Sequence, residues 1–298
     1  MSRSYTVTCI TYLAAFVAAI VVCNLLTNSN QWIMLLFGHL TATLVVFISS
    51  QIFRNSSLYD PFWSVAPIPI VVYLAIYPES EQINLEKTFL IVLPVIFWAF
   101  RLTLNWSRDW KGLGDEDFRY VNLKQKPFSI MIDLFGIHIY PTLQVNLSLL
   151  PIYYGLSIST NSANFYLYLA SIFTISAVIF ETVADEQMRT FRSNNSNIGK
   201  TMKYGLWARS RHPNYLGEIL FWWGLFFMTI SIEPDFWYLF VCPLIMNLMF
   251  SLITCKMMDN RSLKRRDDYT EYLLSLIHIS EPTRRRGISY SVLGVKKK

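Results

Sequence analysis

The segment 205–218 carries the densest group of ionisable side chains, directly before an apolar run. It reads Gly-Leu-Trp-Ala-Arg-Ser-Arg-His-Pro-Asn-Tyr-Leu-Gly-Glu. Arg209, Arg211 and His212 therefore precede a predicted helix N-terminus, where free N–H groups and the helix dipole favour anions such as phosphate. Glu218 lies about one turn inside the apolar run, where a carboxylate usually has a functional role. Alternatively, both arginines are membrane-surface anchors and Glu218 pairs with one of them.

A second charged group ends the preceding apolar run. Glu181, Asp185 and Arg189 are spaced i, i+4 and i+8. A continuing helix therefore places them on one face, with Arg192 close beside them. Guanidinium groups match phosphate oxygens bidentately, so this face suits a ribose and its phosphates. Salt bridges between successive helical turns are the alternative explanation.

A third polar group begins at Arg101, near the inner end of the apolar run 88–104. Asn105 and Arg108 follow it, and an acidic loop with Arg119 and Tyr120 comes next. This group suggests a residue that lines a cavity and a loop that closes over it. The alternative for Arg101 is a side chain that extends to the membrane surface.

The composition indicates that lipid surrounds most of the chain. Of its 298 residues, 53% are apolar, 16% are aromatic and only 15% are charged, against about 25% charged in soluble domains. Apolar runs of roughly 16 to 23 residues recur, and about 20 cross the hydrocarbon layer as a helix. The four cysteines and four histidines are scattered, so we expect neither a disulfide framework nor a metal site.

The sequence predicts an all-α, multi-pass transmembrane helical bundle that forms a single domain over residues 1–274. Lys and Arg concentrate in alternate connections between the apolar runs, which predicts that these connections and both termini are cytoplasmic. Prolines interrupt the third and fifth spans, which membrane helices tolerate when neighbours satisfy the backbone. The eight predicted spans cover residues 6–26, 31–53, 62–77, 88–104, 139–158, 164–184, 215–232 and 236–255.

Residues 275–298 form a basic tail with a different composition. The run 276–285 has no helical period and is similar to the translated read-through of a sequencing adapter. That origin would make the tail an artefact of genome assembly and would mean that the native C-terminus is missing. A disordered basic tail held near anionic lipid headgroups is the alternative.

The charged groups resemble those of a known family. Gly-Leu-Trp, then Arg-His-Pro-Asn-Tyr-x-Gly-Glu, with Ala-Asp-x-Gln-x-x-x-Phe about twenty residues earlier, is similar to the steroid 5α-reductase-related membrane proteins. The likeness covers roughly residues 59–272 and is strongest to an uncharacterised branch, known as a domain of unknown function. The Arg-His-Pro-Asn-Tyr segment at 211–215 is more similar to the corresponding segment of sterol C14 and C7 reductases.

The resemblance implies a cofactor site for NADPH. The steroid 5α-reductases bind NADPH in the C-terminal half of the chain, and in the sterol C14 and C7 reductases the segment that corresponds to 211–215 also contacts it. The expected cofactor-binding residues are Asp185, Arg189, Arg192, Arg211, His212, Asn214, Tyr215 and Glu218. One departure is Glu181, which stands where the steroid reductases carry an amide residue.

For the substrate the resemblance is weaker. In the steroid reductases a Glu and a Tyr hold the steroid keto oxygen. Here Asp60 is a loose match to the Glu, and Trp98 occupies the Tyr-like place. We expect Tyr59, Asp60 and Trp98 to be the catalytic residues that contact the acceptor. An indole donates one hydrogen bond but cannot deliver a proton, so we expect a substrate other than a simple 3-keto steroid handled identically.

These features predict an oxidoreductase acting on CH–CH groups. It would reduce a C=C bond of a sterol-like or polyprenoid lipid with NADPH. One alternative is an isoprenylcysteine-type carboxyl methyltransferase, which shares the Arg-His-Pro-x-Tyr-x-Gly motif and uses S-adenosylmethionine. The arginines favour NADPH, because S-adenosylmethionine has no phosphates. A second alternative is a non-catalytic lipid-binding membrane scaffold.

The expected partners are the membrane and a lipid substrate from the bilayer. We expect no nucleic-acid partner and identify no protein partner. The expected location is the endoplasmic reticulum in a eukaryote or the inner membrane in a bacterium.

Overall fold

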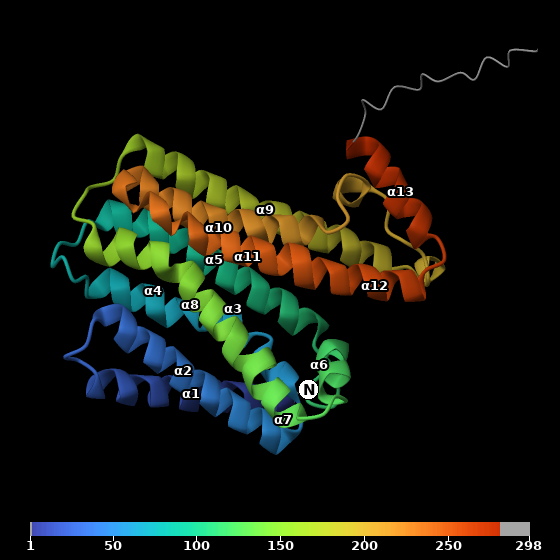
Figure 1. Cartoon of the computed structure of the whole chain (residues 1–298), viewed down its shortest axis with the longest axis horizontal. Coiled ribbons are helices and arrows are strands. Elements are labelled where there is room, and N and C mark those ends of the chain that lie inside the picture. The colour runs from blue at the N-terminus through green and yellow to red at the C-terminus, as the bar shows by residue number, and fades with distance from the viewer. Residues whose placement is uncertain (1, 281–298) are drawn as a thin grey trace, which may run out of the picture.

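The computed structural model describes residues 2–280, and every regular element among them is helical. The long helices lie side by side in one bundle (Figure 1). The α-helices are α1 (Ser2–Leu25), α2 (Gln31–Phe53), α3 (Phe62–Val65), α4 (Pro67–Ile76), α5 (Leu85–Asp109), α6 (Phe118–Lys124), α7 (Ser129–Met131), α8 (Tyr140–Tyr153), α9 (Phe165–Ser193), α10 (Pro213–Ile232), α11 (Val241–Met249), α12 (Cys255–Arg265) and α13 (Tyr269–Ser280). Shorter helical turns are η1 (Ser56–Tyr59), η2 (Ile132–Ile139), η3 (Tyr154–Ile158), η4 (Asn195–Asn197), η5 (Gly205–Ala208), η6 (Pro234–Phe240) and η7 (Phe250–Thr254).

The predicted all-α transmembrane class is confirmed. Within residues 2–280, seven helical stretches are long and apolar enough to cross a membrane. They overlap seven of the eight predicted spans. The predicted fifth span, 139–158, is helical through α8 and η3 but is not among the seven. Its polar residues Gln144 and Asn146 are buried inside the bundle.

Several spans extend beyond their predicted limits. The third begins at Ser56, because η1 and α3 lead into α4. α9 continues to Ser193, and the last span continues to Arg265. α13 continues through Ser280, so residues 275–280 are helical where a tail without helical period was predicted. The rest of the predicted tail, 281–298, lies outside the described residues.

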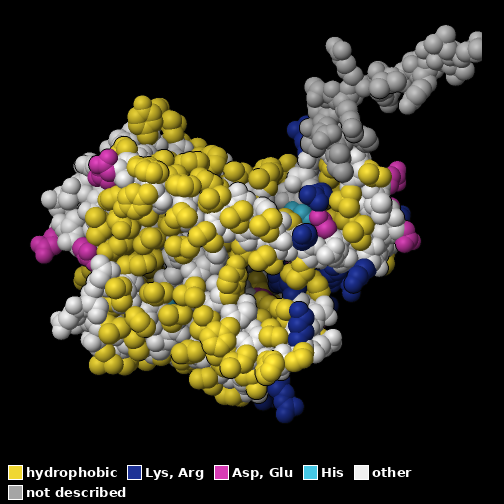
Figure 2. Space-filling model, in the orientation of Figure 1, with side chains coloured by type: hydrophobic (Ala, Val, Ile, Leu, Met, Phe, Trp, Pro, Cys, Tyr) yellow, Lys and Arg dark blue, Asp and Glu magenta, His cyan; other side chains and the backbone are white. Residues whose placement is uncertain are grey.

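Basic side chains gather at one end of the bundle, which we call the basic end. Figure 2 shows a wide apolar surface over the long helices and Lys and Arg side chains near α6, α12 and α13. The described chain begins and ends at this basic end (Figure 1). That distribution agrees with an even number of crossings. The cytoplasmic orientation of the basic end stays a prediction.

Two glycines of α10 allow it to pack tightly against α9. A Cβ at Gly217 would lie 2.6 Å from the Cβ of Glu181, and one at Gly224 would lie 2.3 Å from Oγ1 of Thr174. The two glycines are seven residues apart and therefore share one helix face. Small residues at such a face bring membrane helices close together. This contact holds the start of α10 beside the charged part of α9.

Gly217→Ala is expected to destabilise the protein by about 1–3 kcal/mol, the usual cost of overpacking a filled interior. The added methyl group would also meet the Cα of Glu181 at 2.9 Å, and backbone cannot rotate away as a side chain can. Denaturant titration in detergent micelles measures the change. The control is Gly114→Ala, because nothing lies within 4 Å of a Cβ there. Equal losses in both variants would contradict tight α9–α10 packing.

Candidate functional site

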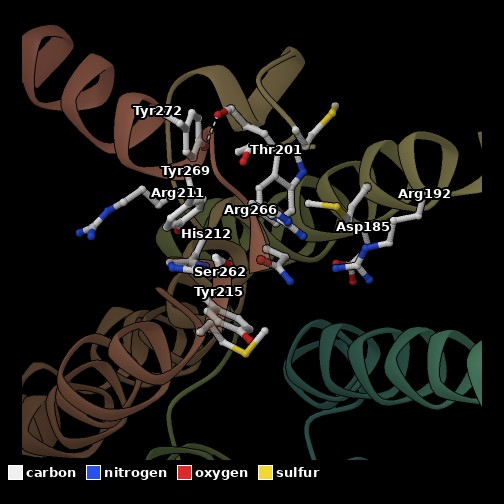
Figure 3. A pocket seen from close by; sticks show the side chains of 15 residues that line it. Asp185, Arg192, Thr201, Arg211, His212, Tyr215, Ser262, Arg266, Tyr269 and Tyr272 are labelled. Atoms are coloured by element: carbon white, nitrogen blue, oxygen red, sulfur yellow. Dashed lines mark hydrogen bonds between the residues drawn. The ribbon is translucent and has the colours of Figure 1, made fainter. Parts of the chain in front are cut away.

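A pocket of about 110 Å³ lies at the basic end, among α9, α10, α12, α13 and the loop 201–212 (Figure 3). We call it the arginine pocket. Segments that are far apart in the sequence each contribute one wall. Its polar and charged lining residues are Asp185, Arg192, Thr201, Arg211, His212, Asn214, Tyr215, Ser262, Arg266, Tyr269 and Tyr272.

Most of the predicted cofactor-binding residues come together here. The ones that line the pocket are Asp185, Arg192, Arg211, His212, Asn214 and Tyr215. Arg189 and Glu218 do not line it. The sequence therefore predicted side chains that converge, although their spacing along the chain did not show the pocket's other walls.

Arg192 and Arg266 line the pocket with no carboxylate partner. Neither guanidinium has an ion pair or hydrogen bond to any residue that the structure describes. Burial lowers the pKa of Arg266, and the charge of Arg192 adds to this effect. Two arginines that repel each other across one pocket create a site for an anion.

Asp259 balances the other cationic groups of the pocket. Its Oδ2 lies 2.7 Å from Arg211 NH1, and its Oδ1 lies 2.7 Å from His212 Nε2. The hydroxyl of Tyr269 also donates to Oδ1 at 2.6 Å. Arg211 is half exposed and points away from the centre of the pocket (Figure 3). Of the pocket's arginines, Arg211 is therefore already neutralised. Tyr215 stacks on His212, with ring centroids 5.3 Å apart.

Lowering the pH is expected to destabilise the protein through His212. Burial lowers the pKa of this imidazole below its ordinary value of 6.5, although the hydrogen bond to Asp259 opposes the shift. The unfolded chain then takes up a proton at a higher pH than the folded chain, so stability falls as the pH drops below about 6.5.

The measurement is thermal unfolding in detergent between about pH 5 and 7.5, below and above the ordinary histidine pKa. We expect His212→Gln to remove part of the acid loss of Tm seen in the wild type. Identical pH profiles for both proteins would show that His212 titrates as in the unfolded chain.

α13 closes one side of the pocket. The hydroxyl of Tyr272 donates to the carbonyl oxygens of Trp207 at 2.5 Å and Ser210 at 3.1 Å. The hydroxyl of Thr201 donates to Asp268 at 2.6 Å, just before α13 begins. Burial raises the pKa of Tyr272 to about 12, so this hydroxyl remains a donor at neutral pH.

Sequence reasoning missed Arg266 and Asp259. Arg266 belongs to a basic run that reads as ordinary membrane-surface charge. Asp259 lies in the middle of that region and shares no motif with the segment that it contacts. Neither residue has a spacing that points to the pocket, because the contacts of Asp259 depend on where α12 lies relative to the loop 201–212.

Beneath the pocket, Arg101 of α5 links two carboxylates of α9. Its guanidinium lies 2.6 Å from Glu181 and also pairs with Asp185. Asn105 donates to the same oxygen of Asp185 at 3.0 Å. Arg101 is only 7% exposed, so it turns into the bundle and not to the membrane surface. Asp185 therefore joins the arginine pocket to a buried ionic cluster.

The structure places Arg189 and Glu218 in other surroundings. Arg189 lies 2.6 Å from Asp109 and donates to Asn105, both on α5. Glu218 is buried and accepts hydrogen bonds from the indoles of Trp98 at 2.9 Å and Trp222 at 2.8 Å. The alternative pairing of Glu218 with one of the arginines at 209 and 211 is wrong.

The predicted acceptor-binding residues lie outside the arginine pocket as well. The Tyr59 hydroxyl lies 2.8 Å from Oγ1 of Thr142, and Asp60 accepts a hydrogen bond of 2.5 Å from Tyr120. Trp98 stacks on a neighbouring phenyl ring in the main core. None of the three lines the arginine pocket. Their contact with a lipid acceptor stays a prediction.

Comparison with known proteins identifies a family without an assigned activity. Residues 46–275 match the profile of the family described as "Protein of unknown function (DUF1295)". The chain is 27% identical over 194 residues to an uncharacterized protein of Schizosaccharomyces pombe. The aligned region covers 57% of this chain and 56% of that protein. The chain therefore spans about half the length of this relative. No solved structure matches the chain. The resemblance to steroid 5α-reductases depends on the motifs alone.

Proposed function

Because this chain belongs to the DUF1295 family and its arginine pocket lies inside the matched region, we propose that the pocket binds NADPH. The protein is then a membrane-embedded reductase of a C=C bond in a sterol-like or polyprenoid lipid. The observation that carries this proposal is the pair of unpartnered arginines, Arg192 and Arg266. Their charges suit the phosphates of NADPH.

The residues of the pocket fit one part of this cofactor. A volume of about 110 Å³ accommodates a phosphate and part of a sugar. Asp185 is held by Arg101 and Asn105, so its carboxylate is oriented to accept a ribose hydroxyl. Binding of the whole dinucleotide requires the loop 201–212 and α13 to move apart. The side-chain contacts of Tyr272 and Asp268 hold these two segments together.

NADPH supplies the hydride when it is bound, and the protein must orient it, exclude water and provide a proton. In this proposal NADPH enters at the basic end, which faces the cytoplasm. The lipid enters from the bilayer of the endoplasmic reticulum or of a bacterial inner membrane. Tyr59, Asp60 and Trp98 remain the candidates for contact with the lipid acceptor.

Titration of the detergent-purified protein with NADPH and, separately, with S-adenosylmethionine tests the proposal. We expect enhanced NADPH fluorescence and a rise in Tm with NADPH, because a ligand that binds the folded state stabilises it. Binding of S-adenosylmethionine without NADPH binding would instead support a methyltransferase. If neither cofactor binds, the lipid-binding scaffold is the better explanation.

A further inference from the structure

We propose that the carboxyl groups of Glu181 and Glu218 share one proton and so form a proton-binding site inside the membrane. Glu181 lies on α9 and is 5% exposed, and Glu218 lies on α10 and is 3% exposed. Both belong to helical stretches that are long and apolar enough to cross a membrane. Neither residue lines the arginine pocket. The ligand of this site is a proton, which needs no open cavity.

The two carboxyl groups meet because α9 and α10 pack tightly at this level. A Cβ at Gly217, the residue before Glu218, would lie 2.6 Å from the Cβ of Glu181. The side chains of Glu181 and Glu218 are close enough to hydrogen-bond to each other. A carboxylate only accepts hydrogen bonds, whereas a protonated carboxyl group donates one. A hydrogen bond between these two groups therefore requires a proton on one of them.

The other contacts of the pair leave one oxygen for this proton. Oε1 of Glu181 lies 2.6 Å from a guanidinium nitrogen of Arg101. The two oxygens of Glu218 accept hydrogen bonds from the indoles of Trp98 and Trp222. Oε2 of Glu181 is buried and has no donor among residues 2–280. The shared proton would satisfy this oxygen, since buried polar atoms in folded proteins are nearly always hydrogen-bonded.

The charges around the pair also favour a bound proton. The charged side chains that act on it are Arg101 from α5 and Asp185 from α9, and α10 carries no charged residue besides Glu218. If all three carboxyl groups were ionised, a single guanidinium would oppose three negative charges inside the membrane, where an unbalanced charge is costly. One proton on the pair halves this excess. Adjacent carboxyl groups retain a proton for the same reason, and the proton belongs to the pair.

Asp185 connects the proton site to the arginine pocket. Arg101 pairs with both Glu181 and Asp185, and Asp185 lines the pocket. A polyanion bound there adds negative charge near the pair, so we expect the pair to hold its proton more tightly when NADPH is bound. This coupling rests on the proposed function. The shared proton itself does not, because it follows from contacts among α5, α9 and α10.

Infrared spectroscopy of the detergent-purified full chain at neutral pH, with no ligand added, tests the site. A protonated carboxyl group has a C=O stretching band that a carboxylate lacks. We expect this band in the wild type, with a shift in heavy water. Glu181→Gln and Glu218→Gln should each reduce it, because the new amide donates to the remaining carboxylate in place of the proton. A band that neither variant reduces would overturn the proposal.

Glu186→Gln is the matched control. Glu186 lies on the same helix as Glu181, but it pairs with Arg108 and is close to half exposed. We expect the band of this variant to equal that of the wild type. Elution from size exclusion shows that each variant is folded. The absence of any protonated carboxyl band in the wild type at neutral pH would overturn the proposal without a variant.

Addition of NADPH separates this proposal from the reductase proposal. The pH at which the band disappears should rise with NADPH, by an amount that corresponds to at least about fivefold tighter proton binding, the lower end of the usual coupling between sites. A band that Glu181→Gln reduces, without any NADPH binding, would support the proton site and contradict the reductase. NADPH binding without the band would contradict the proton site alone. NADPH binding that leaves the titration of the band unchanged would contradict the coupling through Asp185.

Discussion

Replacing Arg266 by alanine is expected to weaken NADPH binding by roughly 10- to 100-fold. Hydrogen bonds to charged groups contribute about 1.5–3 kcal/mol. Arg266 is half-buried, and no residue among 2–280 pairs with its guanidinium and competes for it. Arg192 is more exposed, so Arg192→Ala should cost about 10-fold, near the lower end of that range. Fluorescence titration of NADPH in detergent measures both constants.

The matched control for these two arginines is Arg209→Ala. Arg209 lies in the same basic loop, is exposed, and does not line the arginine pocket. We expect its NADPH affinity to equal that of the wild type. If Arg209→Ala and Arg266→Ala weaken binding equally, the affinity arises from the general positive charge of the basic end. The pocket would then not be the NADPH site.

Arg101→Met is expected to lower the free energy of unfolding by about 3–5 kcal/mol, the usual effect of removing one partner from a buried ion pair. The variant leaves the carboxylates of Glu181 and Asp185 without their guanidinium. Both lie in a membrane-spanning helix, where an unpaired charge is costly. Denaturant titration in detergent, or the fraction that elutes as a monodisperse peak, measures the loss.

Arg108→Met on the same helix is the control. Arg108 pairs with Glu186, but both side chains are close to half exposed, and such surface pairs contribute at most about 1 kcal/mol. A further test is Arg101→Met combined with Glu181→Gln, which removes one of the unpaired charges and should recover part of the stability. If the two single arginine variants are equally stable, Arg101 has no structural role in the buried cluster.

The amino-acid sequence by itself determined that lipid surrounds the chain, that the fold is an all-α transmembrane bundle, and which residues form much of the arginine pocket. Long apolar runs leave a helix as the only way to satisfy the backbone in lipid. The i, i+4 spacing of Glu181 and Asp185 and the position of His212 before a helix are local properties, so they could be predicted. Their convergence also follows from short-range rules, because α9 and α10 are consecutive membrane helices.

Only the tertiary structure decided which charges are paired. Arg189 faces α5 and Arg211 is held by Asp259. Arg192 and Arg266, in contrast, have no partner in the described part of the chain. These outcomes depend on which face of each helix meets its neighbour. Charges at helix ends look alike in the sequence, since membrane-surface anchors and ligand contacts use the same residue types.

The same reason explains Glu218 and the apolar cavity of about 830 Å³ among α1, α2, α3 and α4. Its intramembrane position marked Glu218 as unusual, but only packing showed that two indoles bind it. That cavity has no motif in the sequence, because a void arises from the separation of helices and not from any one segment. The sequence thus determined where polar groups lie along the membrane, and the packing of side chains decided which of them face each other and which face an open space.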